Sequence, residues 1–252
     1  LLSAARCSFN TLKGSQLSIL RSLLSDVLTA TKGGARQADS YLADPILIMP
    51  EESPVRASRK VLNVGGNSKE IPLPPEYAGF DHCLLDIDPR GSPDIVCDAR
   101  ELTTLDEGIF DAVYCSHNLE HYYRHDVPKV LAGFLHVLKE GGFAQVRVPD
   151  MSEVMRLTME RGLDIDDVLY TSPSGPIMVL DVFYGYSVEI ERSGQDFYAH
   201  KTGFTQKSLL AALNRAGFSK TYSILGNLEI SALAFKGTPD PLLRELFKLP
   251  DD

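Results

Sequence analysis

From residue 60 onward, short apolar runs alternate with longer segments in which apolar residues recur every three or four positions. The short runs are bounded by turn residues and predict strands. The longer segment LEHYYRHDVPKVLAGFLHVLK predicts a helix that begins at Leu119 and is ended by Gly141–Gly142. This alternation indicates an α/β fold with a doubly wound, mostly parallel sheet. The predicted strands are KVLNVG, HCLLDID, PDIVCDA, FDAVYCSH and FAQVRVPD.

Two segments depart from regular alternation. The crossover NSKEIPLPPEYAGF contains Pro72, Pro74 and Pro75, and proline both lacks a donor and clashes with the preceding helical turn. We therefore expect no full-length helix between the first two strands. The segment TYSILGNLEISALAFKG reads as two strands joined near Gly226–Asn227, which predicts an antiparallel pair at the edge of the sheet.

The chain divides into three parts by pattern. Residues 1–59 form a predicted N-terminal arm, with an amphipathic helix at 15–31 whose docking against the main domain, a partner or a membrane surface stays open. Residues 60–238 form the main domain, and 239–252 a C-terminal tail. An insertion at about 165–200 is rich in aromatic residues, which is typical of a lid over a site and equally of simple aromatic burial.

Composition narrows the class of protein. The 252 residues are 44% hydrophobic, and no run reaches the roughly 18–20 apolar residues that span a bilayer. The first residues lack the apolar core of a secretory signal. The net charge of −9 argues against a nucleic-acid partner, which normally meets a basic surface. No feature of the sequence predicts an oligomeric state.

Cysteine usage indicates a reducing compartment. Cys7, Cys83, Cys97 and Cys115 form no CxxC pair, and three of them lie in apolar, strand-like runs. Buried cysteine usually behaves as a small hydrophobic residue. We therefore expect reduced structural thiols and a cytoplasmic setting, with redox or metal roles as the alternative.

The residues that carry chemistry stand where predicted strands end. In an open parallel sheet, ligands bind beyond the carboxyl ends of the strands. A ligand site is therefore expected there. The residues at these positions are Gly65, Asp86, Asp98, Ser116, His117 and Asp150.

Five motifs in this order resemble those of the class I S-adenosylmethionine-dependent methyltransferases, and most of all the bacterial "type 11" group. They are VLNVGG, LLDIDP, IVCDAREL, FDAVYCSHNLEHY and VLKEGGFAQVRVPD, covering residues 60–150. HKTGFTQKSLLAALNRAGF at 200–218 is similar to a later segment of that group. The resemblance implies a Rossmann-like methyltransferase fold and S-adenosyl-L-methionine as the cofactor.

In the family, the loop after the first strand contacts the cofactor, which implies roles for Asn63, Gly65, Gly66 and Asn67. A side chain at Gly65 would collide with a cofactor that approaches the backbone. The loop departs from the family pattern, because Asn67 and Lys69 replace glycines. Asparagine is the residue besides glycine that best tolerates the left-handed conformation. A plain strand-to-loop turn is the alternative.

The resemblance also assigns the nucleoside contacts. Asp86 would accept hydrogen bonds from the ribose hydroxyls, with Asp88 as the alternative acid. Asp98 would accept from the adenine amino group and Ala99 would donate its backbone N–H, whereas a helix N-cap is the alternative role for Asp98. Ser116 would face the cofactor at the end of the fourth strand.

His117 and Asp150 are the predicted catalytic residues. His117 follows the fourth strand, where an imidazole could act as a general base, contact the cofactor or merely pack. Asp150 would line the acceptor pocket. The predicted reaction is methyl transfer to an oxygen or nitrogen of a small-molecule or sugar-like acceptor.

The segment from His117 to His121 spells H-x-x-E-H, a zinc-peptidase pattern. On one helix, His117 and His121 would share a face, and His125, Glu189 or Glu191 would have to add the third ligand. This zinc hydrolase is a remote alternative, and no metal site is assigned.

Two further alternatives remain. A non-catalytic relative that binds a partner or acts as a scaffold would also explain the altered glycine loop. A nicotinamide dehydrogenase would need G-x-G-x-x-G opening a helix, and the adjacent Gly65 and Gly66 do not supply it.

Overall fold

The computed structural model describes residues 58–173 and 175–250, which lie within one compact unit of the chain. The predicted helix at 15–31 and nearly all of the N-terminal arm lie outside the described residues.

The described residues build a seven-stranded sheet in the order β3-β2-β1-β4-β5-β9-β8. The first five strands run parallel, whereas β9 runs antiparallel to both β5 and β8. The mostly parallel α/β sheet and the antiparallel edge pair are thus confirmed. The strands are β1 (Lys60–Val64), β2 (Asp81–Asp86), β3 (Ile95–Val96), β4 (Phe110–Ser116), β5 (Leu138–Pro149), β8 (Lys220–Gly226) and β9 (Glu229–Phe235).

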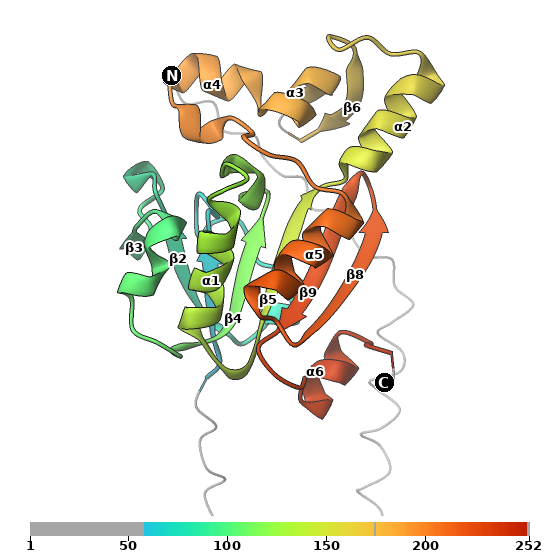
Figure 1. Ribbon diagram of the computed structural model, residues 1–252. Helices are drawn as coiled ribbons and strands as arrows, with labels where there is room; N and C mark the ends of the chain where they lie inside the picture. Colours follow the sequence, from blue (N-terminus) through green and yellow to red (C-terminus); the bar gives the residue numbers. More distant parts are fainter. Residues whose placement is uncertain (1–57, 174, 251–252) are drawn as a thin grey trace, which may run out of the picture. The chain divides into compact units, whose positions relative to one another are not determined.

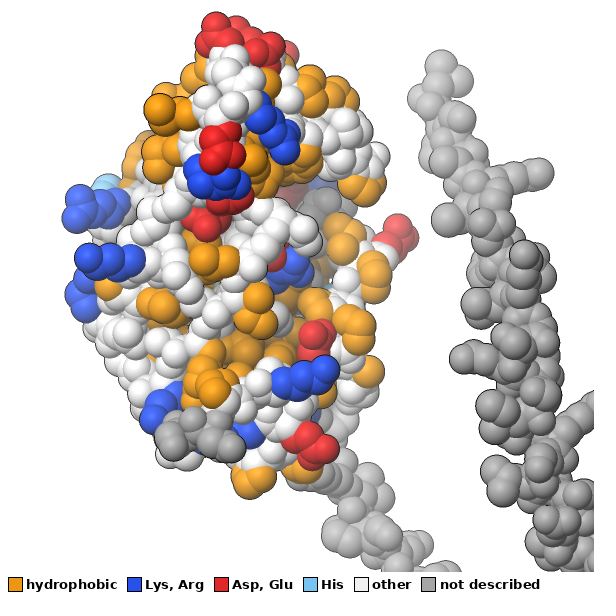
Figure 2. All heavy atoms as spheres, turned by 90° about the vertical axis from the view of Figure 1, so that its right-hand side faces the viewer, with side chains coloured by type: hydrophobic (Ala, Val, Ile, Leu, Met, Phe, Trp, Pro, Cys, Tyr) orange, Lys and Arg blue, Asp and Glu red, His pale blue; other side chains and the backbone are white. Residues whose placement is uncertain are grey.

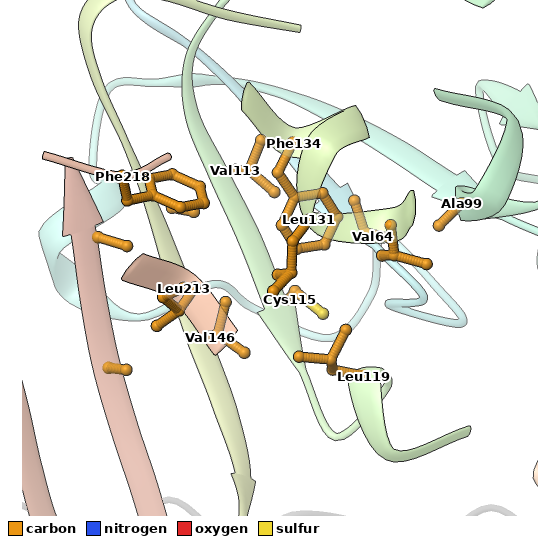
Figure 3. Close-up of a cluster of buried hydrophobic side chains, with 14 of the residues drawn as sticks. Val64, Ala99, Val113, Cys115, Leu119, Leu131, Phe134, Val146, Leu213 and Phe218 are labelled. Carbon is orange, nitrogen blue, oxygen red and sulfur yellow. The ribbon is translucent and has the colours of Figure 1, made fainter. Parts of the chain in front are cut away.

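One face of the sheet is covered by helices α1 (Val127–Val137) and α5 (Gln206–Ala216) and by the 3₁₀ helix η3 (Ala99–Thr104) (Figure 1). Figure 3 shows Leu131 and Phe134 of α1 lying against Val113 and Cys115 of β4. All four side chains are fully buried. This larger core fixes the strands whose ends carry the site.

The other face of the sheet is covered by short helical elements. Between β1 and β2 the chain forms only a single 3₁₀ turn, η1 (Pro75–Tyr77), as the prolines predict. Tyr77 is buried against the sheet, and its hydroxyl donates to Gln145 Oε1 at 2.9 Å. Helix α6 (Pro241–Leu246) adds the buried side chain of Leu243 to the same small core. The predicted C-terminal tail therefore contains a helix that packs on the domain.

The predicted helix from Leu119 is wrong at both ends. Residues 119–121 form a separate 3₁₀ turn, η4 (Leu119–His121), and α1 begins only at Val127, with Pro128 in its first turn. Proline is favoured there because the first helical N–H groups have no intrahelical acceptor. The helix ends at Val137, and Gly141–Gly142 lie inside β5, since Leu138 already pairs with β4.

The insertion lies beyond the carboxyl ends of the parallel strands (Figure 1). It has its own small core of buried side chains, which includes Val154, Leu169 and Val182. Helix α2 (Met151–Arg161) precedes the predicted insertion and packs in the same small core. The elements of the insertion itself are β6 (Val168–Ser172), β7 (Gly175–Met178), α3 (Val179–Tyr184), α4 (Ser187–Ser193) and η5 (Asp196–Tyr198).

The face drawn in Figure 2 carries positive and negative side chains interspersed with hydrophobic ones. Among the described helices, none is long and apolar enough to cross a membrane. Cys83, Cys97 and Cys115 are free thiols, and Cys7 lies outside the described residues.

Candidate functional site

A pocket of about 160 Å³ opens at the carboxyl ends of β1, β2 and β4. It gathers residues that stand far apart in sequence but end neighbouring parallel strands. Of the predicted cofactor and catalytic residues, the structure brings five to its lining: Gly65, Asn67, Asp86, Asp98 and His117.

The loop after β1 keeps the backbone shape that the site requires. Gly65 has a φ of +71°, and a Cβ at this position would lie 2.1 Å from the Asn118 side-chain nitrogen. Glycine is therefore required here by Asn118 as well as by the backbone conformation. Asn67 adopts the left-handed conformation with a φ of 60°, as expected for an asparagine that replaces glycine.

Asp86 ties this loop to the second strand. Its Oδ2 accepts from the backbone N–H of Asn67 and its Oδ1 from that of Asp88, both at 2.9 Å. A carboxylate has about four acceptor positions, so two bonds leave acceptor capacity facing the pocket. Asp88, the alternative acid, is instead bound by Arg90 through two nitrogens.

Four predicted cofactor residues lie outside the lining of this pocket. Asn63 is buried below the loop, where its amide nitrogen lies 3.1 Å from His82 Nε2. A Cβ on Gly66 would collide with the Asn63 side chain, which explains the second glycine. Ala99 is buried at the start of η3, and Ser116 is the half-buried end of β4. Their cofactor roles stay predictions.

Asp98 lines the pocket and also caps a helix. It lines the pocket, and its carboxylate caps η3 by accepting from the Arg100 backbone N–H at 2.9 Å. Desolvation by itself raises the pKa of Asp98, but the hydrogen bonds and charge of Arg100 outweigh it and lower that pKa. The carboxylate is therefore ionised, and its adenine contact stays a prediction.

The insertion closes over this pocket through η5. Phe197 and Tyr198 line it, and the Tyr198 hydroxyl lies 3.2 Å from Asp88 Oδ2 and 3.1 Å from Arg90 Nη2. These bonds connect the insertion to the loop after β2.

A second pocket, of about 440 Å³, lies between the insertion and the turn that joins β8 to β9. Tyr170, Asp181 and His200 line it from the insertion side, and Glu229 lines it from β9. His117 lines both pockets and belongs to the wall of each.

His117 sits in a left-handed turn with a φ of 49° and lies between two carboxylates. Its Nε2 is 2.9 Å from Glu229 Oε2, and its Nδ1 is 3.5 Å from Glu120 Oε1. Desolvation lowers the pKa of His117, but the neighbouring carboxylates of Glu120 and Glu229 outweigh it and raise that pKa to about 9. A ring protonated at neutral pH does not favour the predicted general-base role.

Asp150 lies outside the lining of both pockets. It is buried and caps α2, because its Oδ1 accepts from the Ser152 backbone N–H at 3.0 Å. The structure thus gives Asp150 a helix-capping role, and its catalytic role stays a prediction.

Residues 60–146 match the family model described as "Methyltransferase domain". Over this part, the chain is similar to methyltransferase domains. The resemblance carried by its motifs is confirmed, and the 3-2-1-4-5 order of its parallel strands agrees with it.

Several solved structures are similar to this chain. A SAM-dependent methyltransferase from Archaeoglobus fulgidus shares 17% identity over 71% of this chain and 87% of its own, with a TM-score of 0.45. The 1,6-didemethyltoxoflavin-N1-methyltransferase of Burkholderia thailandensis shares 18% identity over 71% of this chain and 72% of its own, with a TM-score of 0.41. The PH0226 protein of Pyrococcus horikoshii shares 14% identity over 72% of this chain and 84% of its own, with a TM-score of 0.47. No protein with a curated function matches the sequence.

Several residues that line the two pockets were not predicted, among them Asn118, Ile87, Tyr198 and Glu229. Asn118 and Ile87 each follow a predicted site residue directly, so proximity to a strand end was an available signal. Tyr198 belongs to the aromatic insertion, whose lining of both pockets agrees with the lid hypothesis. Glu229 reaches His117 only because β9 pairs with β5, and nothing in the local sequence marks it.

The remote zinc hydrolase alternative would need His117 and His121 on one helix face, and the structure does not provide this. His117 precedes the short turn η4 instead of sharing an α-helix with His121, and His121 Nε2 lies 3.2 Å from the His117 carbonyl oxygen. Among the described residues, Glu120, His121 and His200 are the group whose ligand atoms come together.

Proposed function

We propose that this protein transfers a methyl group from S-adenosyl-L-methionine to an oxygen or nitrogen of a small-molecule or sugar-like acceptor. The cofactor occupies the pocket at the strand ends, and the acceptor occupies the second pocket. The observation that carries this proposal is that His117 lines both cavities, because methyl transfer needs two reactants that meet at one point.

The residues of the first pocket fit the cofactor group by group. Asp86 retains acceptor capacity for ribose hydroxyls. Among the described residues, Asn118 Oδ1 is a buried acceptor without a hydrogen-bond partner, and it suits the cofactor's ammonium group. Ile87 lines the pocket although its side chain is 42% exposed, and this apolar surface suits an adenine ring.

The cofactor supplies a methyl group that its sulfonium already activates, so the protein chiefly positions the reactants. Phe197 and Tyr198 exclude water from the cofactor pocket. In the second pocket Tyr170 and Ile177 provide apolar surface, whereas Asp181 and Glu229 provide negative charge. This lining favours a neutral or cationic acceptor over a polyanion. His117 lies where it can contact the reacting atoms.

The test is calorimetric titration of the purified chain with S-adenosylhomocysteine. We expect a Kd on the order of 1–100 µM, the range of an ordinary metabolite complex. Asp86→Asn keeps the side-chain shape but removes the charge, and it should weaken binding about tenfold or more. Asp106→Asn is the matched control, because Asp106 is exposed and lies outside both pockets.

Two results would overturn the proposal. An absence of heat at millimolar ligand would favour the non-catalytic relative. Equal affinities of the parent chain and Asp86→Asn, with both folded by circular dichroism, would remove the ribose assignment of Asp86.

A further inference from the structure

Glu120, His121 and His200 bring one ligand atom each to within 4.8 Å of one another. The first two belong to η4, and the third lies at the end of the insertion, far along the chain. The segment that carries His200 is held in place by the backbone, since the Glu120 carbonyl oxygen accepts from Lys201 and Thr202 at 2.8 and 3.1 Å. The grouping is therefore a product of the fold.

Glu120 is fully buried, and among the described residues neither of its carboxylate oxygens has a hydrogen-bond partner. An unpaired buried carboxylate is costly, and such groups are normally paired or coordinate a metal. His117 Nδ1 lies 3.5 Å from Oε1, which exceeds the 2.7–2.9 Å of a good charge-assisted hydrogen bond. The second oxygen, Oε2, has no such neighbour in the described part of the chain.

The His200 imidazole is oriented as a metal-binding histidine is. His200 Nδ1 lies 2.9 Å from the Val182 carbonyl oxygen, so it donates there and leaves a lone pair on Nε2. A backbone carbonyl that accepts from the other ring nitrogen is the usual support of a metal-binding histidine. His121 contacts carbonyl oxygens of Ala199 and His117 through its two nitrogens, each at 3.2 Å. A neutral ring donates to only one of them, so its other nitrogen carries a lone pair, and this nitrogen must turn from the carbonyl oxygen beside it to bind an ion.

We propose that Glu120, His121 and His200 bind a divalent transition-metal ion. Two imidazoles and one carboxylate suit Zn²⁺, Co²⁺ or Fe²⁺, and three protein ligands leave coordination positions open. His121 lines the cofactor pocket and His200 lines the second pocket, so the ion lies between them. Resting on the proposed function, we assign the open position to a hydroxyl oxygen of the acceptor, which selects oxygen acceptors over nitrogen ones.

Binding of Co²⁺ to the chelator-treated, full-length chain tests the metal site directly. Visible absorption bands of bound Co²⁺ report its ligands, and calorimetry gives the stoichiometry. We expect one Co²⁺ per chain. Glu120→Gln and His200→Ala should each weaken binding about tenfold or more, and Zn²⁺ should displace Co²⁺. His125→Ala is the matched control, because the His125 side chain is 80% exposed and lies outside the cluster.

Glu120→Gln preserves the shape of the side chain and removes a buried charge, so this variant should fold. Its thermal midpoint, measured without metal, checks that directly. An absence of Co²⁺ binding, equal binding by all variants, or an intense thiolate-to-cobalt band that places the ion on a cysteine would each overturn the proposal. Binding of S-adenosylhomocysteine in the presence of chelator is independent of these results, so failure of the metal site and failure of the methyltransferase function are distinguishable.

Discussion

The side chain of Asn118 occupies the space that a Cβ on Gly65 would need, with Nδ2 only 2.1 Å from that position. The loop after β1 and the turn after β4 are thereby fitted to each other. Gly65 was predicted to matter only through the cofactor, and Asn118 was not predicted. The two residues nevertheless depend on each other before any ligand is present.

Gly65→Ala should displace Asn118 and strain the backbone, because φ is +71° there. We expect a loss of unfolding free energy of about 1–3 kcal/mol and weaker binding of S-adenosylhomocysteine. Urea denaturation and calorimetry measure the two effects. Gly141→Ala is the control, since its φ is +76° but a Cβ there meets nothing within 4 Å. Equal losses of affinity in both variants would contradict a specific role for Asn118.

Tyr198→Phe removes the hydroxyl that connects η5 to Asp88 and Arg90. We expect a loss of about 0.5–1.5 kcal/mol in unfolding free energy, typical of one hydrogen bond, and faster dissociation of S-adenosylhomocysteine. Stopped-flow displacement measures the dissociation rate. Tyr184→Phe serves as the control because Tyr184 is 60% exposed and lies outside both pockets. An unchanged rate in Tyr198→Phe would show that this contact does not hold the lid.

Stability at acid pH should depend on Arg90. Its hydrogen bonds to Asp88 are the largest cause that lowers the pKa of this buried carboxyl to about 2. The folded pKa is below the unfolded one, so the stabilisation is complete above about pH 4 and is lost as the pH falls through 2. Arg90→Gln should therefore be less stable than the parent chain at pH 5, and the loss should be small because Arg90 is largely exposed and its charge is screened by solvent.

The difference between Arg90→Gln and the parent chain should shrink between pH 4 and pH 2, as followed by urea denaturation. Arg124→Gln, at an exposed arginine, provides the control for loss of a positive charge. A pH-independent difference would mean that Arg90 acts through packing and not through the charge of Asp88.

Tyr77 should be the main support of the sheet face that lacks a crossover helix. Tyr77→Phe leaves the Gln145 amide oxygen without its donor and should cost about 1–3 kcal/mol, whereas Tyr77→Ala should cost about 3–5 kcal/mol through the cavity it creates. Tyr222→Phe, at a half-buried tyrosine on β8, is the comparison. If Tyr77→Phe is no more destabilising than Tyr222→Phe, the hydrogen bond to Gln145 contributes little.

Strand positions and their order were predictable because apolar runs and turn residues act locally. The prolines at 72, 74 and 75 likewise excluded a crossover helix in advance. The helix before β5 was predicted too long, since Gly141–Gly142 look like a helix end although pairing with β4 has already drawn Leu138 into a strand. The local sequence pattern gives no information on long-range strand pairing.

The residues of the candidate site likewise fall into those that the sequence predicts and those that it does not. Gly65, Asp86, Asp98 and His117 were predictable, because each stands at a strand end and all such ends meet at one edge of a parallel sheet. Glu229 and His200 were not, because antiparallel pairing and the packing of the insertion bring them to the site. Asp150 shares the strand-end position but is used by the next helix as its cap.

On the face of the sheet opposite α1 and α5, the core is completed by two residues far apart in sequence. Tyr77 lies between β1 and β2, and Leu243 belongs to α6. During synthesis, the aromatic side chains of this face stay exposed to solvent until residues 241–249 have left the ribosome and can pack on them. Removal of that short segment, or a bulky fusion placed directly after it, would therefore expose apolar surface while leaving the lining of both pockets unchanged. Aggregation during expression, more than loss of ligand binding, is the failure to watch for in shortened versions of this protein.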